Sequence, residues 1–252
     1  MWAVDSSSAS ATAIERVLPT GCMHVVVRLT DEPLTLFARD DGADARTIAG
    51  SVIGGARSTS YVRAVPRITR SVGVQLAPAG GALLGLPAGE LAEAHTRLDD
   101  VWGREAARLR ERLADAETPT AQLDTLESWL LARLPRVRGV HPMVVDAVDC
   151  FGGGARVGDV VERSGYSHRT FLTVFRQAVG LAPKTFCRVL RVQRAIGALG
   201  RGDSLAGAAA DAGYADQAHL ARDFAAIAGV APGRYLALSP EASNHVPIRS
   251  RS

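Results

Sequence analysis

The chain has 252 residues, a formal net charge of +3 and an apolar fraction of 47%. Its length suits one large or two modest domains, and its ordinary composition excludes wholesale disorder, collagen-like repeats and a coiled coil. No apolar run approaches the ~18 residues of a membrane-spanning helix, and the first residues lack the basic and apolar regions of a signal peptide. We therefore expect a cytoplasmic protein without a membrane partner.

Short β-type runs, separated by glycine and proline, occupy the first third of the chain after a polar tail over residues 1–14, which we expect to be disordered. The expected strands are Cys22–Leu29, Pro33–Ala38, Thr47–Ile53, Ser60–Val65 and Ile68–Leu76. Thr30-Asp-Glu is expected to join the first two strands as a hairpin. This spacing predicts a small antiparallel sheet or a partial barrel.

A helical period begins at Pro87. One apolar face of a first helical segment is formed by Leu98, Trp102, Leu109 and Leu113. For Trp102 and Trp129, a place beside an apolar pocket of the β-segment and a place in the plain core both stay open, and the core is the commoner case. Thr118 and Pro119 are typical of the N-cap and first position of the next helix. The apolar stripe of that helix is expected at Leu123, Leu126, Leu130 and Leu134.

Two domains follow from this pattern. Residues 15–135 are expected to form an α+β N-terminal domain, and the breaker-rich, basic segment 136–142 a linker. A regulatory or sensor role for the N-terminal domain is a hypothesis that rests on the domain arrangement. Residues 143–238 are expected to form an all-α domain, and residues 239–252 a disordered tail. Gly152–Gly154 is expected to act as a hinge, because it lacks the further residues of a phosphate-binding loop.

The three cysteines, at positions 22, 150 and 187, lie far apart in the sequence. This number and spacing favour free thiols in a reducing compartment over disulfides. Cys22 and His24 have the spacing of two metal ligands, but no second pair at zinc spacing accompanies them. We expect no metal and no cofactor.

The C-terminal half contains an internal repeat. Val157–Phe186 resembles Leu205–Tyr235, with the shared positions Gly165 and Gly213, Phe175 and Phe224, Gly180 and Gly229, Pro183 and Pro232, and Phe186 and Tyr235. Each copy predicts a short helix, a turn at glycine and a second helix, because a left-handed turn favours a residue without Cβ. The units are expected at about 156–180 and 204–229, joined by one helix over about 183–199. Such a bridge suits two readers in major grooves ~34 Å apart.

The second copy, Gly-Tyr-x-Asp-Gln-x-His-Leu-x-Arg-x-Phe from Gly213 to Phe224, resembles the AraC/XylS family of bacterial transcription regulators. The resemblance covers about residues 141–238. It implies a nucleoid-associated bacterial protein that binds double-stranded DNA in a sequence-specific way and regulates transcription as an activator or repressor. It leaves open an RNA polymerase contact and a homodimer.

Four further motifs resemble an uncharacterised domain that is fused to AraC-type readers, mostly in actinobacteria and their relatives: Leu18-Pro19-x-Gly21-Cys22, Val72-Gly73-Val74, Leu83–Leu86 and Leu98-x-x-Val-Trp102-Gly103. The resemblance implies a partial β-barrel followed by helices, with a small-molecule effector as a candidate ligand. Where that pattern often has Asp, this chain has His24.

The second helix of each unit supplies the expected DNA contacts. These are His168, Arg169, Thr170, Thr173 and Arg176 in the first unit, Gln217, His219 and Arg222 in the second, and Lys184 at the start of the bridging helix. Arg169 suits a bidentate contact to guanine or a phosphate contact, and Gln217 suits adenine. Asp216 is interpreted as an N-cap. For Arg188, Arg191 and Arg194, an internal salt bridge, a solvated face and a phosphate contact all stay open.

Charge is distributed unevenly between the two units. Residues 156–201 hold nine basic and two acidic side chains, a balance of +7, whereas residues 202–238 have a balance of −2. Because phosphate neutralisation dominates DNA affinity, we expect the first unit to supply most of the affinity. The second unit then adds modest specificity or contacts RNA polymerase.

Two other functions were weighed. The resemblance extends to regulators that repair alkylated DNA through zinc-bound cysteines, but three scattered cysteines cannot form a four-cysteine cluster. The sequence motifs of hydrolases, metalloproteases and nucleotide-binding proteins are also missing, so we do not expect this protein to be an enzyme. A ligand-binding protein whose reader has lost DNA affinity is the second alternative, since the second unit is acidic.

Overall fold

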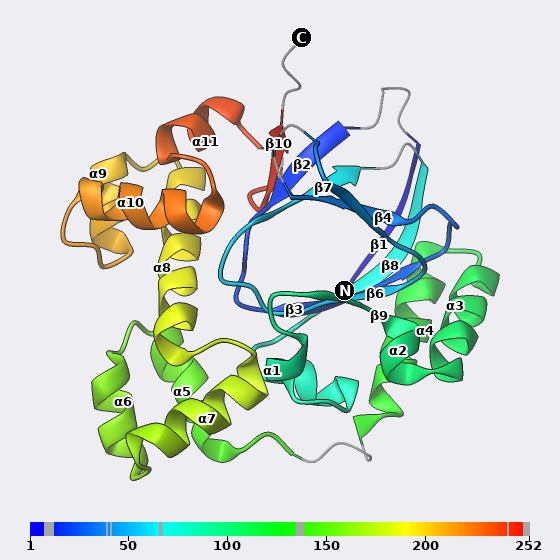
Figure 1. The fold of residues 1–252 in the computed structure, drawn as a ribbon, viewed down its shortest axis with the longest axis horizontal. Coiled ribbons are helices and arrows are strands. Elements are labelled where there is room, and N and C mark those ends of the chain that lie inside the picture. The colour runs from blue at the N-terminus through cyan, green and yellow to red at the C-terminus, as the bar shows by residue number, and fades with distance from the viewer. Residues whose placement is uncertain are drawn as a thin grey trace.

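Two five-stranded antiparallel sheets make up the β-rich half of the molecule. The computed structural model describes residues 1–7, 13–38, 40, 42–65, 68–134, 139–240 and 242–248. The first sheet has the order β1 (Trp2–Ser7), β8 (Ile68–Leu76), β3 (Met23–Arg28), β6 (Val52–Gly54) and β9 (His95–Arg97). The second has the order β10 (His245–Ile248), β2 (Ala13–Val17), β7 (Tyr61–Val65), β4 (Leu34–Phe37) and β5 (Ala45–Ile48). Figure 1 shows the strands arranged around a common interior.

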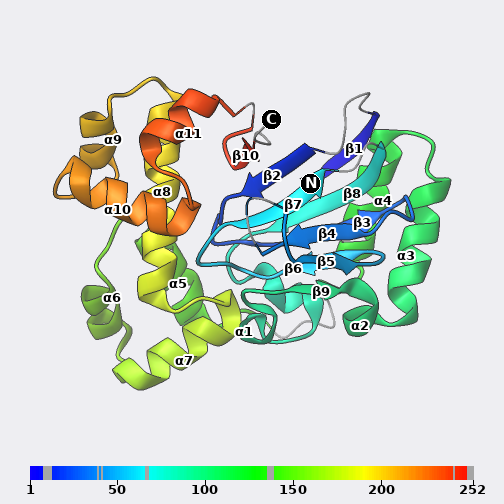
Figure 2. The same cartoon turned by 45° about the horizontal axis from the view of Figure 1, so that its top comes forward.

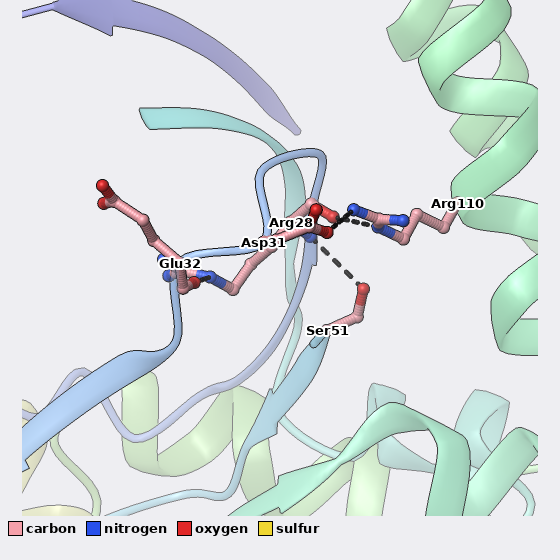
Figure 3. A network of polar contacts seen from close by, with 5 residues as sticks. All are labelled: Arg28, Asp31, Glu32, Ser51 and Arg110. Carbon is pink, nitrogen blue, oxygen red and sulfur yellow. Dashed lines mark hydrogen bonds and ion pairs between the residues drawn. The ribbon is translucent and has the colours of Figure 1, made fainter. Parts of the chain in front are cut away.

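The prediction that the first two strands, Cys22–Leu29 and Pro33–Ala38, form a hairpin is wrong. β3 pairs with β6 and β8, whereas β4 pairs with β5 and β7 in the other sheet. Residues 29–33 instead cross between the sheets, and Figure 3 shows how Arg110 of helix α3 holds this crossing. The Arg110 guanidinium donates to the Arg28 carbonyl oxygen at 2.8 Å and pairs with Asp31 at 2.8 Å. The predicted strand Thr47–Ile53 is likewise divided into β5 and β6, with Gly50 at a positive φ of 75° between them.

Both predicted disordered tails contain a strand. β1 pairs with β8 from Trp2 opposite Gly73 to Ser7 opposite Ile68. A Cβ at Gly73 would overlap the Trp2 ring, so this strand needs glycine opposite the indole. β10 near the C-terminus adds to the edge of β2, with His245 opposite Val17, as Figure 2 shows. The parts of the two predicted tails at residues 8–12, 241 and 249–252 lie outside the described residues.

Short helices follow the strands in the first half: η1 (Gly80–Leu84), α1 (Ala88–Leu91), α2 (Leu98–Trp102), α3 (Arg104–Asp115) and α4 (Pro119–Leu131). The predicted apolar face is confirmed, since Leu98, Leu109 and Leu113 are fully buried. The chain breaks this segment into α2 and α3 at Gly103, which has a φ of +54°. The Thr118 cap is also confirmed, because its hydroxyl accepts from the Ala121 N–H at 3.2 Å. Leu134 does not belong to the stripe: α4 ends at Leu131, and Leu134 is half exposed.

The second half is helical, with α5 (Pro142–Gly152), α6 (Val157–Ser164), α7 (His168–Val179), α8 (Pro183–Gly200), α9 (Leu205–Asp211), α10 (Gln217–Ala228) and α11 (Pro232–Leu238). Residues 135–138 of the predicted linker region lie outside the described residues. The core of the first repeat is a cluster of four fully or almost fully buried phenylalanines, at positions 151, 171, 175 and 186. None of the helices in the described part of the chain combines the length and apolarity that crossing a bilayer requires.

Candidate nucleic-acid interface and interior cavity

The first unit consists of α6, a turn at Gly165 and α7. Gly165 adopts the left-handed conformation with a φ of 71°, and its N–H donates to the Glu162 carbonyl oxygen at 3.3 Å. Ser167 caps α7, since its hydroxyl accepts from the Thr170 N–H at 3.2 Å. Phe171 and Phe175 are fully buried on the inner face of α7. The periodicity of the helix therefore turns the opposite face outward.

The outer face of α7 carries the predicted readers of the first unit, and all five are exposed: His168, Arg169, Thr170, Thr173 and Arg176. The Thr173 hydroxyl donates to the Arg169 carbonyl oxygen at 3.0 Å, so it is directed back at the helix. Within the described residues, the guanidinium groups of Arg169 and Arg176 form no hydrogen bond or ion pair. These two cations are therefore available to an external acceptor.

The second unit repeats this arrangement with α9, a turn at Gly213 (φ +77°) and α10. The Asp216 carboxylate accepts from the His219 N–H at 2.6 Å, which confirms the predicted N-cap. Gln217 and Arg222 are exposed, whereas the His219 ring is half-buried and meets the Tyr214 ring edge-on at 5.1 Å. Of the predicted readers of the second unit, Gln217 and Arg222 are thus the accessible ones.

Helix α8 joins the units and is locked to α10 by ion pairs. Figure 1 shows the two units at opposite ends of this helix, which at 18 residues is ~27 Å long. The Asp223 carboxylate of α10 is largely buried and pairs with Arg188 at 2.8 Å and with Arg191 at 3.5 Å. Of the alternatives left open for these two arginines, the structure shows the internal salt bridge. Lys184, at the first turn of α8, is exposed.

We expect the Asp223→Asn variant to lose about 2 kcal/mol of unfolding free energy, because hydrogen bonds to a charged, largely buried partner are lost. The Asp211→Asn variant is the matched control. Asp211 pairs with Arg201 at an exposed site, where such pairs contribute well under about 1 kcal/mol. Urea denaturation measures both changes, and equal losses would contradict the role of Asp223.

The +7 balance of residues 156–201 overstates the free charge of the first unit. Four of its arginines pair with aspartates outside that segment, namely Arg163 with Asp146, Arg188 and Arg191 with Asp223, and Arg201 with Asp203 and Asp211. The cations that stay exposed and unpaired in the described structure include Arg169, Arg176 and Lys184. The excess positive charge is therefore concentrated on α7 and the start of α8.

A cavity of about 630 Å³ lies inside the β-rich half, between the two sheets. Its lining includes His24 and Arg28 of β3, Tyr61 and Arg63 of β7, and Arg57 from the loop between β6 and β7. Residues 242–245, which lead into β10, close part of the wall. Trp102 and Trp129 do not line this cavity. Trp102 packs at the helical side, where its indole N–H donates to the Leu84 carbonyl oxygen at 3.2 Å.

Two histidines beside the cavity give the fold an acid-sensitive region. Burial, with Arg57 next in effect, lowers the pKa of His95 to about 3, and burial with Arg63 lowers the pKa of His24 to about 4. Both ring nitrogens of His95 lack a hydrogen-bond partner in the described structure. The unfolded chain, with a pKa near 6.5, binds more protons below that pH than the native chain does. Stability is therefore expected to fall as the pH decreases from 6.5 towards 3.

The His95→Leu variant tests this pH dependence. We expect the wild-type chain to lose about 2 kcal/mol more unfolding free energy than the variant between pH 7 and pH 5, because leucine takes up no proton. Urea denaturation at both pH values measures the difference. Identical pH dependence in the two proteins would contradict the prediction.

The loop over residues 55–61 touches the cavity on one side and both helix-turn-helix units on the other. Gly55, Arg57 and Tyr61 line the cavity. Between them, Ala56 packs against Gly180 at the end of α7, and the Ser60 N–H donates to the Ile227 carbonyl oxygen of α10 at 2.8 Å. The C-terminal ends of both second helices therefore meet the same loop.

Bridging helix α8 also contacts cavity-lining segments. The Gln193 side-chain amide donates to the Pro19 carbonyl oxygen at 2.7 Å and to the Asn244 side-chain oxygen at 2.8 Å. Gly21, with a φ of +78°, lies so close to the Phe186 ring that a Cβ would be 3.0 Å from it. The Leu18–Cys22 motif thus forms a second contact between the two halves of the molecule, beside that of the loop over residues 55–61.

Two family models match the chain. A model described as a helix-turn-helix domain matches residues 160–237, and a model described as a domain of unknown function (DUF6597) matches residues 1–97. The first is of the AraC type. The chain therefore contains an AraC-type helix-turn-helix domain. It is a DNA-binding transcription regulator. No curated protein matches the sequence.

Solved structures similar to this chain include ToxT from Vibrio cholerae. ToxT of strain O395 bound to (E)-4-(8-methylnaphthalen-1-yl)but-3-enoic acid has 12% identity and a TM-score of 0.50, covering 94% of this chain and 98% of its own. Another O395 structure has 11% identity and a TM-score of 0.49, covering 96% and 98%. Unsaturated fatty acid-bound ToxT of strain SCE256 has 13% identity and a TM-score of 0.47, covering 93% of each chain. At such identity the likeness shows the fold alone.

This fold confirms the expected class, an α+β N-terminal domain followed by an all-α double helix-turn-helix domain. The exposed predicted readers lie on two helix faces and at the start of α8, but sequence reasoning missed Asp223 and the cavity arginines. Asp223 lies 35 residues from Arg188, and a charged residue at a buried helix position was the only signal for it. Arg28, at the end of a strongly apolar strand, offered a similar signal.

Proposed function

We propose that this regulator reads one operator with both helix-turn-helix units, which enter successive major grooves on one face of the duplex. The observation that carries the proposal is the pair of exposed second helices at opposite ends of α8. Helix α10 is fixed to α8 through Asp223, and α7 through the contact of Phe175 with Phe186. A rigid bridge of ~27 Å lets a single chain hold two readers at a fixed separation near one helical turn.

In this proposal each reader has its own chemistry. Arg169 donates to guanine O6 and N7, while Arg176 and Lys184 contact phosphates. His168 and Thr170 lie at the first turn of α7, where side chains approach base edges, and Thr173 meets a phosphate or a thymine methyl group. Gln217 reads adenine, Arg222 reaches guanine or phosphate, and His219 contacts the sugar-phosphate backbone of the DNA. The first unit supplies most of the affinity, because more of the exposed cations without an ion pair in the described structure lie there: Arg169, Arg176 and Lys184, against Arg222 and Arg234 in the second.

The second part of the proposal is that the interior cavity holds a small-molecule effector. ToxT has been solved with an unsaturated fatty acid and with a butenoic acid derivative. In this chain, support comes from the cavity itself, whose volume lies within the ~300–1,000 Å³ of small-molecule sites. Ligand contact with Arg57 or Tyr61 would act on the loop that also touches Gly180 and Ile227, and thereby on the spacing of the readers.

Further parts of the proposal follow from its central claim. A regulator of this kind works on the chromosome, so we place it in the bacterial nucleoid. The acidic second unit has few free cations for DNA and more surface for a protein, which supports a contact with RNA polymerase. A homodimer would bring four readers to an operator with two-fold symmetry.

A gel-shift assay on the DNA upstream of its own gene, with a salt titration, tests the DNA-binding proposal. We expect a complex that specific competitor DNA removes and non-specific DNA does not, and an affinity that falls steeply with salt. Binding that is equally weak to all sequences would instead favour a ligand-binding protein whose reader has lost its DNA affinity.

A further inference from the structure

The cavity between the sheets is lined by three arginines, Arg28, Arg57 and Arg63, and by no carboxylate among the described residues. Glu15 lies outside the lining, and its carboxylate pairs with Arg63 at 2.6 Å and with the His245 ring at 2.9 Å. Arg63 is therefore partly neutralised. Within the described structure Arg28 and Arg57 form no ion pair, although the carboxylates of Glu32 and Glu93 act on them electrostatically from outside the lining.

Arg28 is the most buried of these cations, with 5% of its surface exposed. Its Nε donates to the Glu32 carbonyl oxygen at 3.0 Å, as Figure 3 shows, but its Nη2 is buried and has no partner in the described structure. An unpaired buried charge costs several kcal/mol. A ligand that enters the cavity and accepts a hydrogen bond from this guanidinium would offset that cost, and this would favour binding.

Arg57, in the loop between β6 and β7, also has a buried guanidinium nitrogen without a partner in the described structure. Its Nη1 donates to the Glu93 carbonyl oxygen at 2.9 Å, its Nε is buried and unpartnered, and its guanidinium lies 5.0 Å from the centre of the Tyr61 ring. The pKa of His24 responds to the same field, because Arg63 and Arg57 lower it in addition to burial. Two unpaired donor groups and a positive potential thus surround one space.

We propose that this cavity binds an organic anion, whose oxyanion accepts hydrogen bonds from Arg28 and Arg57. The body of the ligand would pack on the apolar part of the wall, which includes Trp2, Val17 and Val26. The inference rests on the proposed effector site and names the chemistry of its ligand. The planar guanidinium group of arginine binds carboxylate and phosphate groups alike, so the test includes a ligand of each kind.

Four probes that share one apolar body separate the possibilities: 4-phenylbutyrate, 4-phenylbutyl phosphate, 4-phenylbutanol and 4-phenylbutylamine. Isothermal titration of the full-length chain with each probe measures the affinity, and the shift in Tm provides a second readout. We expect the carboxylate, the phosphate or both to bind at least tenfold more tightly than the alcohol, and the amine not to bind. The anion with the higher affinity shows whether the site prefers a carboxylate or a phosphate.

Variants assign the binding to the arginines. Arg28→Gln and Arg57→Gln are each expected to weaken anion binding at least tenfold, whereas Arg108→Gln, at an exposed position of α3 outside the cavity lining, should leave it unchanged. If Arg28→Gln does not fold, Arg57→Gln carries the test alone. Unchanged anion affinity in both folded variants would overturn the inference.

Two further outcomes separate this inference from the proposed function. Equal binding of the alcohol and the anions would support an effector cavity but overturn the anion assignment. Binding of none of the probes, with a normal DNA complex in the gel shift, would overturn the anion inference and leave the DNA-reading proposal standing.

Discussion

Replacing Arg169 with alanine is expected to weaken operator binding about 10- to 100-fold, which corresponds to the 1–3 kcal/mol of a bidentate guanine contact. Arg169 is exposed on the outer face of α7 and forms no hydrogen bond or ion pair within the described residues. Its loss therefore costs DNA contacts without releasing an internal partner. Fluorescence anisotropy with labelled operator at one fixed salt concentration measures the change.

The matched comparison is Arg222→Ala in the second unit, for which we expect less than about a tenfold loss. Arg222 is equally exposed on α10, but the segment around it has a net negative balance. A larger loss for Arg222→Ala than for Arg169→Ala would contradict the asymmetric binding. Arg108→Ala on α3 serves as a control for a general loss of positive charge.

Replacing Phe175 with alanine is expected to lower the unfolding free energy by about 3–5 kcal/mol, the range for removing a phenylalanine from a packed core. Phe175 is fully buried, and its ring centroid lies 5.5 Å from that of Phe151 and 5.6 Å from that of Phe186. The three rings come from α7, α5 and α8, so the cavity left by the variant would loosen all three helices. Urea denaturation, followed by circular dichroism, measures the loss.

Val145→Ala is the control, because Val145 lies on the neighbouring helix α5 but is half exposed. We expect its cost to stay within about 0.5 kcal/mol, as for most surface substitutions. A loss below 1 kcal/mol for Phe175→Ala would show that the ring cluster does not hold the first unit together. DNA affinity should fall with Phe175→Ala as well, since the position of α7 depends on this core.

The helix-turn-helix half was predictable because its determinants are local. The turn glycine, the N-cap serine or aspartate and the buried phenylalanines all lie within about one repeat of each other, as Ser167, Asp216 and Phe175 illustrate. The outward positions of Arg169 and Gln217 then follow from the helical period. Nothing outside the repeat is needed to place them.

The β-rich half was predictable only in part. Its alternating residues located strands such as β3 and β8, but the partner of a strand is set by residues far away. His24 pairs with Gly54 in one direction and with Gln75 in the other, and a single sequence contains no signal for that choice. The terminal strands β1 and β10 were missed for the same reason, because each forms only by pairing with a strand that is distant in the sequence, β8 for β1 and β2 for β10.

The cavity and the ion pairs required the structure. Arg28, Arg57 and Arg63 come from two strands and a loop, and only the closure of the two sheets brings them around one space. The contact of residues 55–61 with both units is also a property of the folded chain. It joins Ala56 to Gly180 and Ser60 to Ile227, across more than 100 residues of sequence in each case.

Hydroxyl-radical footprinting of the full-length chain on the DNA upstream of its own gene tests the central claim most directly. Two readers at the ends of α8 predict two protected backbone segments on one face of the duplex, about 10 base pairs apart. Arg169→Ala should weaken protection of the first segment most. A single protected segment, protection on opposite faces of the duplex, or no sequence-specific footprint would contradict the account.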